Sequence, residues 1–310
     1  MRKIKRILKV VLKIPRDFEL LSKIVFWRFY RPARYNRPFI VIGEARSGST
    51  WLMELLTTSL EAMTVWEPFH PQKGLFRAYG WRLLSTNSAQ QRDSIVRDFK
   101  NLENIQNINK WAISKNEWGQ LTSRNAIVKT VRLMPSVWTL YSSFNSRLNF
   151  VILLRNPIEI GLSQIRSFGK KNNLVRHVYV PEFLNSVEKK VWSEIEDNEL
   201  LRQVFVVSKS LHEFYRNAAN FPAEICIEYS NLLNSQEKEL SKIFKFYNCQ
   251  DYVKTESRNL MSSTALNGVK QKYPGELKLL SGLENRVRVE TIFRLYSIPM
   301  KYLEILEDMA

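Results

Sequence analysis

The chain has 310 residues, and 47 Lys and Arg against 30 Asp and Glu give it a formal net charge of +17. With 45% hydrophobic and 12% aromatic residues it can bury a sizeable core, which excludes a disordered or fibrous protein. Domains usually have roughly 100–200 residues, so the length allows either one or two.

The cysteine and histidine contents restrict metal and redox chemistry. The two cysteines, Cys226 and Cys249, exclude a disulfide framework and an all-cysteine zinc site, and they fit a reducing compartment. The three histidines, His70, His177 and His212, are too scattered for a histidine-rich metal cluster. No apolar run approaches the ~18 residues of a transmembrane helix. We therefore expect neither a bound metal nor a transmembrane segment.

Positive charge is concentrated at the N-terminus. Residues 1–37 hold twelve Lys or Arg and two acidic residues, a net charge of +10, and residues 38–310 carry the remaining +7. In residues 1–14, apolar side chains recur at helical spacing and basic ones fill the other positions. Pro15 ends this predicted amphipathic helix, and a second apolar stretch runs from Leu20 to Tyr30.

Two interpretations of residues 1–30 stay open at this stage. The segment can lie on an anionic membrane surface, where each Lys or Arg contributes about 1 kcal/mol. Alternatively, it packs on the body of the protein with its basic face in solvent. Nucleic acid is not an expected partner, because no recognised binding motif accompanies the charge.

From residue 38 onward, short apolar runs alternate with helical patterns. The predicted strands cover 38–43, 62–66, 126–131, 150–154 and 224–229, and the predicted helices cover 49–60, 88–110, 183–218 and 236–247, with another starting at Pro157. Strands separated by helices indicate a mainly parallel sheet with helices on both faces. We predict one α/β domain, P-loop-like, over 38–310, preceded by a basic arm over 1–37.

The first predicted strand leads into a glycine-rich turn, Gly43-Glu-Ala-Arg46-Ser47-Gly48-Ser49-Thr50. This turn has the G-x4-G spacing of a phosphate-binding loop between a strand and a helix. Such a loop points backbone N–H groups inward, and the helix N-terminus adds positive potential. Ser49 stands where an ATP-binding loop has its lysine, so the turn suits a phosphate-like group better than ATP with magnesium.

A second basic residue follows the apolar strand 150–154. Arg155 comes directly after this strand, and Ser163 lies two turns into the helix that begins at Pro157. Both loops are expected at the edge where open α/β sheets bind ligands. Arginine can bind phosphate through two parallel hydrogen bonds. The alternative is that Arg155 pairs with a carboxylate of the protein.

These two elements together resemble the sulfotransferases that use 3'-phosphoadenosine-5'-phosphosulfate (PAPS). The loop of that family for the 5'-phosphosulfate has the form of Arg46-Ser-Gly-Ser-Thr-Trp51, and its 3'-phosphate element has the form of Arg155-Asn-Pro with a serine eight residues after the arginine. The resemblance implies that Arg46, Ser47, Gly48, Ser49 and Thr50 hold the 5' end, with Arg46 at the leaving oxygen. It also implies that Arg155 and Ser163 bind the 3'-phosphate. Trp51 matches an aromatic position beside adenine, or it is a core residue.

Three further stretches are similar to the carbohydrate branch of this family. They are Trp66-Glu-Pro-Phe-His70, Val128-Lys-Thr-Val-Arg132 and Ile227-Glu-Tyr-Ser-Asn-Leu232. The last stretch departs from the family pattern, because Glu228 replaces an arginine and Ser230-Asn231 replace an acidic pair. The resemblance covers about residues 38–250.

A hydroxyl acceptor requires a general base within hydrogen-bond reach. The resemblance favours Glu67, and His70 competes for the role because its ordinary pKa, near 6.5, suits it. Glu67 can instead form a structural pair with Lys129 or Arg132. Lys129 is either a second cation at the transferred group or part of such an ion pair.

The expected function is therefore sulfuryl transfer from PAPS, without a metal, to the hydroxyl of a carbohydrate or glycolipid. Two other classes are weighed against it: a P-loop nucleotide or small-molecule kinase, and a non-catalytic membrane-surface binding protein. The expected location is cytoplasmic, peripheral on the inner face of the membrane through residues 1–30.

Overall fold

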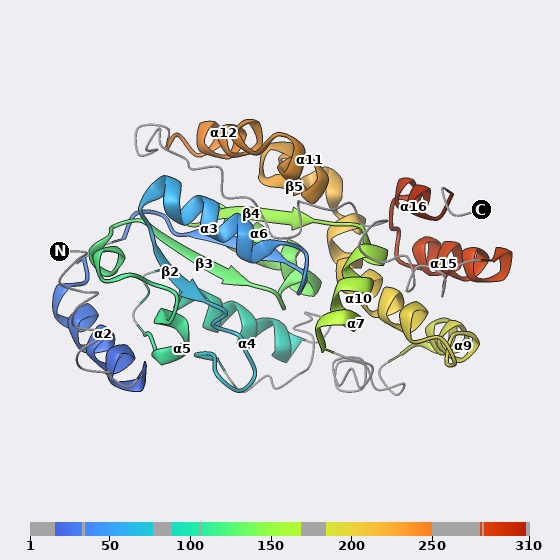
Figure 1. The fold of residues 1–310 in the computed structure, drawn as a ribbon, viewed down its shortest axis with the longest axis horizontal. Helices are drawn as coiled ribbons and strands as arrows, with labels where there is room; N and C mark the ends of the chain where they lie inside the picture. Colours follow the sequence, from blue (N-terminus) through green and yellow to red (C-terminus); the bar gives the residue numbers. More distant parts are fainter. Residues whose placement is uncertain are drawn as a thin grey trace.

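A computed structural model describes residues 16–32, 35–76, 89–103, 105, 107–168, 184–249, 280 and 282–307. Within this part of the chain, five parallel strands form one sheet in the order β2-β3-β1-β4-β5 (Figure 1). The strands are β1 (Phe39–Gly43), β2 (Met63–Trp66), β3 (Ala126–Thr130), β4 (Asn149–Leu154) and β5 (Cys226–Glu228). The predicted mainly parallel α/β sheet is thus confirmed.

The strands are buried on both faces, which explains their continuous apolar sequences. Alternate residues of β1 enter different core clusters, with Ile40 and Ile42 on one face and Phe39 and Val41 on the other. Helices α3 (Ser49–Leu60), α11 (Tyr229–Asn234) and α12 (Gln236–Phe246) cover one face. The other is covered by α4 (Ala89–Lys100), α6 (Val137–Phe144), α7 (Pro157–Phe168) and α10 (Glu199–Arg216), so α12 and α4 lie on opposite sides of the sheet in Figure 1.

Most predicted elements agree with the observed ones to within two residues, but two long helices were predicted wrongly. The helix expected over 88–110 ends at Lys100, and a short helix, α5 (Lys110–Ile113), starts where the Asn109 side chain accepts a hydrogen bond from the Ala112 N–H. The zone 183–218 contains two helices, α9 (Ser186–Glu194) and α10. Here Asn198 accepts from the Leu201 N–H and so starts a new helix.

The C-terminal part contains elements that the sequence did not predict. They are α15 (Leu283–Leu295), a 3₁₀ turn η9 (Met300–Leu303) and α16 (Glu304–Glu307). Val289, Ile292 and Phe293 of α15 are buried in the same core cluster as α10. This segment therefore packs on α10 and extends the core on that side of the sheet.

The predicted helix over residues 1–14 lies outside the described residues, but the second apolar stretch is helical, as α2 (Arg16–Tyr30). Trp27 of α2 is 2% exposed, and Lys23 Nζ donates to the Asn116 carbonyl at 2.8 Å. The helix contacts α5 and the 3₁₀ turn η2 (Trp118–Thr122). One face of α2 therefore packs on the body of the protein. None of the described helices is long and apolar enough to cross a membrane.

Candidate active site

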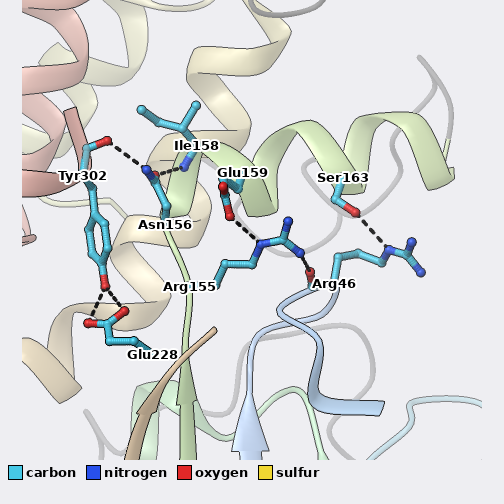
Figure 2. Close-up of polar contacts among 8 residues, drawn as sticks. All are labelled: Arg46, Arg155, Asn156, Ile158, Glu159, Ser163, Glu228 and Tyr302. Atoms are coloured by element: carbon cyan, nitrogen blue, oxygen red, sulfur yellow. Dashed lines mark hydrogen bonds and ion pairs between the residues drawn. The ribbon is translucent and has the colours of Figure 1, made fainter. Parts of the chain in front are cut away.

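The two predicted anion-binding elements meet at the carboxyl edge of the sheet. Gly43 at the end of β1 pairs with Leu153 of β4, so the loops that follow these strands start side by side. The guanidinium of Arg155 donates from Nη1 to the Arg46 carbonyl at 3.1 Å, and Arg46 Nε donates to Ser163 Oγ at 3.3 Å (Figure 2). Three residues predicted from two distant motifs thus form one connected cluster.

The loop after β1 has the backbone geometry of an anion cradle. Arg46 and Gly48 have positive φ angles of 72° and 99°, and a Cβ at Gly48 would lie 2.5 Å from Tyr229 Cε2. Helix α3 starts at Ser49, and no side-chain hydrogen bond from Gly48 caps its first turn. Ser47 Oγ is buried and makes no hydrogen bond to the described protein groups. This site fits a phosphate or sulfate group.

Arg155 is held from three sides. Its side chain is 4% exposed, and Nε pairs with Glu159 Oε2 of α7 at 2.7 Å. The guanidinium also lies 4.2 Å from the centre of the Tyr229 ring. The carboxylate pairing considered as the alternative for Arg155 is therefore present, and it orients the guanidinium toward the loop after β1.

Trp51 occupies the position expected of a core residue. It is buried on the first turn of α3, and its ring meets Tyr229 edge-on at 6.0 Å between centroids. Tyr229 thus contacts Gly48, Trp51 and Arg155 together. The sequence did not single out this tyrosine, although it directly follows the departure from the family pattern at Glu228.

On the other side of the edge, Glu67 forms an ion pair with Lys129 of β3. Glu67 follows β2 with a positive φ of 40°, and its N–H donates to the Lys129 carbonyl at 2.9 Å. Lys129 Nζ also lies 4.3 Å from the centre of the Trp66 ring. Burial lowers the pKa of Lys129, and the Glu67 carboxylate opposes that change. The ion pair considered as an alternative for both residues is therefore formed.

His70 lies one turn beyond Glu67, and its ring is fixed by the backbone. The Nδ1 atom accepts from the N–H groups of Gln72 and Lys73, at 3.3 and 3.2 Å. Burial is the main cause that lowers the pKa of His70. The Glu67 carboxylate raises this pKa, and the nearby lysines and Arg132 lower it further. The neutral ring then carries its proton on Nε2.

A buried acid in the loop itself was not identified from the sequence. Glu44 directly follows β1, and Ser210 of α10 donates a hydrogen bond to its carboxylate. Burial raises the pKa of Glu44 to about 7, although Ser210, the Ala45 backbone and Arg132 favour the ionised form. Burial likewise lowers the pKa of Arg132 to about 10, against the effect of Glu44 and Glu67. An acid placed beside a buried glycine-rich turn is the signal that could have revealed this group.

Metal ligands do not gather at this edge. Across the described residues, no group of three or more His, Cys, Asp or Glu side chains could hold a metal ion. The charged groups described at the site are instead cations that lie beside three carboxylates, Glu44, Glu67 and Glu159.

The fold and the edge cluster define a parallel α/β protein with a P-loop-like turn after β1. Residues 36–287 match the sulfotransferase domain family, and the chain belongs to that family. It is therefore an enzyme of the PAPS-dependent sulfotransferase class, whose members transfer a sulfuryl group to hydroxyl-bearing acceptors. No curated protein sequence matches the chain.

Solved structures similar to this chain include other sulfotransferases. The sulfotransferase domain from the curacin biosynthetic pathway shares 17% identity, with 82% of this chain and 83% of that chain covered and a TM-score of 0.40. A sulfotransferase from Alicyclobacillus acidocaldarius shares 14% identity, covering 85% and 97%, with a TM-score of 0.37. Sulfotransferase STF9 from Mycobacterium avium shares 14% identity, covering 97% and 82%, with a TM-score of 0.41.

Proposed function

We propose that this enzyme transfers the sulfuryl group of PAPS to a hydroxyl of a carbohydrate or glycolipid. The observation that carries the donor half of this proposal is the contact between the loop after β1 and the element after β4, through Arg46, Arg155 and Ser163. PAPS carries anionic groups at both its 5' and 3' ends. Two basic elements in contact suit such a ligand better than a single phosphate.

Each group of the donor has a proposed partner. The backbone N–H groups of Gly48, Ser49 and Thr50 hold the 5'-phosphate, and the hydroxyls of Ser47, Ser49 and Thr50 add hydrogen bonds. Arg46 is exposed beside this loop, where it can neutralise charge on the leaving oxygen. Sulfuryl transfer, like phosphoryl transfer, requires in-line attack and stabilisation of such charge.

The 3'-phosphate is assigned to Arg155 and Ser163. A guanidinium has five N–H donors, and the contacts with Glu159 and the Arg46 carbonyl use two of them. The group can therefore bind an anion while it keeps its orientation. Trp51 is packed too deeply in the core to stack freely, and we propose that it shapes the adenine side of the site from behind.

Glu67 is the proposed general base. Its carboxylate is partly exposed and lies against Lys129, which keeps the base and a cation together at the edge where the acceptor enters. Lys129 can then stabilise charge on the transferred group. The orientation of His70 supports this choice, because Nδ1 already accepts two backbone hydrogen bonds and Nε2 holds the proton.

The assignment of the acceptor to the carbohydrate branch is supported by the three similar stretches around Glu67, Lys129 and Tyr229. Two of these stretches, Trp66–His70 and Val128–Arg132, contribute the proposed base and its cation. We infer a saccharide or glycolipid hydroxyl as the acceptor. Screening sugar and glycolipid acceptors with labelled PAPS tests this inference directly, and transfer to none of them would contradict it.

A kinase that shares the sheet and loop is the competing function. It would need the lysine that Ser49 replaces, together with a magnesium ligand. Calorimetry of the full chain with adenosine 3',5'-bisphosphate and, separately, with ATP and magnesium distinguishes the two. Tighter binding of the bisphosphate is expected, and preference for ATP with magnesium would overturn the sulfotransferase proposal.

We further propose that residues 1–37 form an N-terminal arm that contacts an anionic membrane surface, while one face of α2 packs on the catalytic domain over 38–310. The face of α2 opposite Trp27 exposes four large apolar residues, Phe18, Leu21, Val25 and Phe29, at spacings of three and four. The net charge of +10 over residues 1–37 opposes pairing between two copies and attracts anionic lipids. The proposed location is the cytoplasmic face of the membrane, in keeping with two free cysteines.

A further inference from the structure

The residue next to Arg155 is bonded to the far end of the chain. Asn156 Oδ1 accepts from the Ile158 N–H at 2.9 Å and so caps the first turn of α7. Its Nδ2 donates to the Tyr302 carbonyl of η9 at 2.8 Å (Figure 2). Because the amide group is planar, these two bonds together set the position of the α7 N-terminus relative to η9.

Tyr302 is itself anchored at the end of the neighbouring strand. Its hydroxyl donates to the Glu228 carboxylate, at 2.7 and 2.9 Å from the two oxygens, and accepts from the Tyr215 hydroxyl at 3.0 Å. Lys301 Nζ also pairs with Glu228 at 3.1 Å. Since Glu228 pairs with Leu154 across the sheet, η9 connects the carboxyl ends of β4 and β5.

This connection explains a departure from the family pattern. Glu228 stands where the resemblance has an arginine, and its carboxylate is the group that binds both Lys301 and Tyr302. Residues 300–303 lie beyond the part of the chain that matches the family, which ends at residue 287. We define Met300–Leu303 as the latch.

We propose that Tyr302 is a positioning residue for the 3'-phosphate element, and that the latch sets how strongly the enzyme discriminates nucleotides that carry a 3'-phosphate. The inference rests on the proposed role of Arg155 and Ser163. Both lie on or beside α7, so a shift of its first turn moves them relative to the loop after β1. Binding through two parallel hydrogen bonds is sensitive to such shifts, because its strength depends on the alignment of donors and acceptors.

The test compares affinities for adenosine 3',5'-bisphosphate and for adenosine 5'-phosphate, which lacks the 3'-phosphate, in the full chain by calorimetry. Tyr302→Phe is expected to reduce the ratio of these affinities by about tenfold, with little change for the 5'-phosphate. The matched control is Tyr247→Phe. This change also removes a tyrosine hydroxyl from a partly buried hydrogen bond, in this case one donated to the Phe150 carbonyl of β4. This control is expected to keep the ratio.

A second variant keeps the test informative if Tyr302→Phe reduces the stability of the whole protein. Asn156→Ser keeps an oxygen that can cap α7 but removes the donor to the Tyr302 carbonyl, and it is expected to lower the ratio similarly. A wild-type ratio near one would overturn the proposed 3'-phosphate site and this inference with it. A large wild-type ratio that the Tyr302 and Asn156 variants retain would overturn the inference alone, as would an equal loss in Tyr247→Phe.

Discussion

The Nη1 atom of Arg155 lies 3.1 Å from the carbonyl oxygen of Arg46 and donates a hydrogen bond to it. This bond joins two loops whose arginines are separated by 109 residues in sequence. It holds the Arg46 backbone in its left-handed conformation, with φ of 72°, from outside the loop. The two proposed halves of the nucleotide site are therefore coupled before any ligand binds.

Replacement of Arg155 by lysine is expected to weaken binding of adenosine 3',5'-bisphosphate by about tenfold or more. Lysine keeps the charge but loses the planar fork and the bond to the Arg46 carbonyl. Calorimetry measures the change. Arg286→Lys is a suitable control, because Arg286 also pairs with an acid four residues later, Glu290, but lies on α15. Equal affinity in Arg155→Lys and the wild type would contradict the assignment.

Gly48→Ala is expected to abolish tight nucleotide binding and to destabilise the fold by about 1–3 kcal/mol. At this position the backbone has a positive φ of 99°, which alanine rarely adopts. The new Cβ would also lie 2.5 Å from the Tyr229 ring, which Arg155 contacts as well. Thermal unfolding and calorimetry measure the two effects. In the control, Gly119→Ala, a Cβ meets nothing within 4 Å. Normal binding by Gly48→Ala would show that the loop is not the phosphate site.

Glu67→Gln is expected to reduce kcat by about 10²–10⁴-fold while nucleotide affinity changes little. Glutamine retains the shape of the side chain but cannot accept the acceptor's proton. Steady-state kinetics with labelled PAPS, together with calorimetry, separates the two quantities. His70→Gln provides the comparison and should retain most of the turnover. The reverse result, with Glu67→Gln active and His70→Gln inactive, would transfer the role of base to His70.

Stability is expected to fall as the pH rises from about 4.5 toward 7, because Glu44 holds its proton more tightly when folded. Burial raises its pKa from 4.5 to about 7, so its contribution is complete at low pH and lost as Glu44 ionises. The full loss is about 3 kcal/mol. Glu44→Gln should remove the part of this slope that Glu44 contributes, as measured by urea unfolding across the pH range.

Glu213 provides a control for that pH experiment. Burial also raises its pKa to about 7, but it contacts Thr139 on α6 and lies outside the loop. Glu213→Gln should remove a similar part of the stability slope. Ionised Glu44 places a negative charge beside the proposed phosphate site, so nucleotide affinity is expected to decline above pH 7. Only Glu44→Gln should weaken that decline. An unchanged slope in Glu44→Gln would mean that folding does not raise the pKa of Glu44.

Val25→Asp is expected to reduce binding to vesicles that contain phosphatidylserine by about tenfold, because it places a charge in the exposed apolar face of α2. Sedimentation with such vesicles and with pure phosphatidylcholine vesicles measures the fraction bound. Val187→Asp on α9 is the matched control, because Val187 is 58% exposed and Val25 is 53% exposed. This control is expected to bind the vesicles as the wild type does. If wild type and both variants bind equally, or none binds, α2 is not a membrane-contacting surface.

The predictable parts of the fold were those that depend on local sequence. The apolar runs of β1 and β4 are continuous because both faces of the sheet are covered, and the strand bounds followed from that pattern. The helix boundaries near Asn109 and Asn198 were missed. Their side chains start new helices by accepting backbone hydrogen bonds, a signal weaker than the apolar periodicity that runs across it.

The glycine-rich turn after β1, the arginine after β4 and the acid after β2 could all be found from the sequence, because glycine spacing and residues at strand ends are local features. Their partners could not be found in this way. Ser210, which binds Glu44, and Tyr302, which binds Asn156, are 166 and 146 residues away in the chain. Glu159 is only four residues from Arg155, but the sequence alone left open whether a carboxylate pairs with this arginine. Such pairings are decided by how the helices pack.

The net positive charge also separates what the sequence determines from what the tertiary structure determines. By itself, the sequence determined the +17 total, its concentration in residues 1–37, and the alternation that produces a parallel sheet. Only the tertiary structure decided that Arg155 is held by Glu159, Tyr229 and the Arg46 carbonyl, and that α2 packs through Trp27 with a second apolar face exposed. The physical reason is that charge and periodicity are properties of the chain, whereas burial and hydrogen-bond partners depend on which segments come into contact.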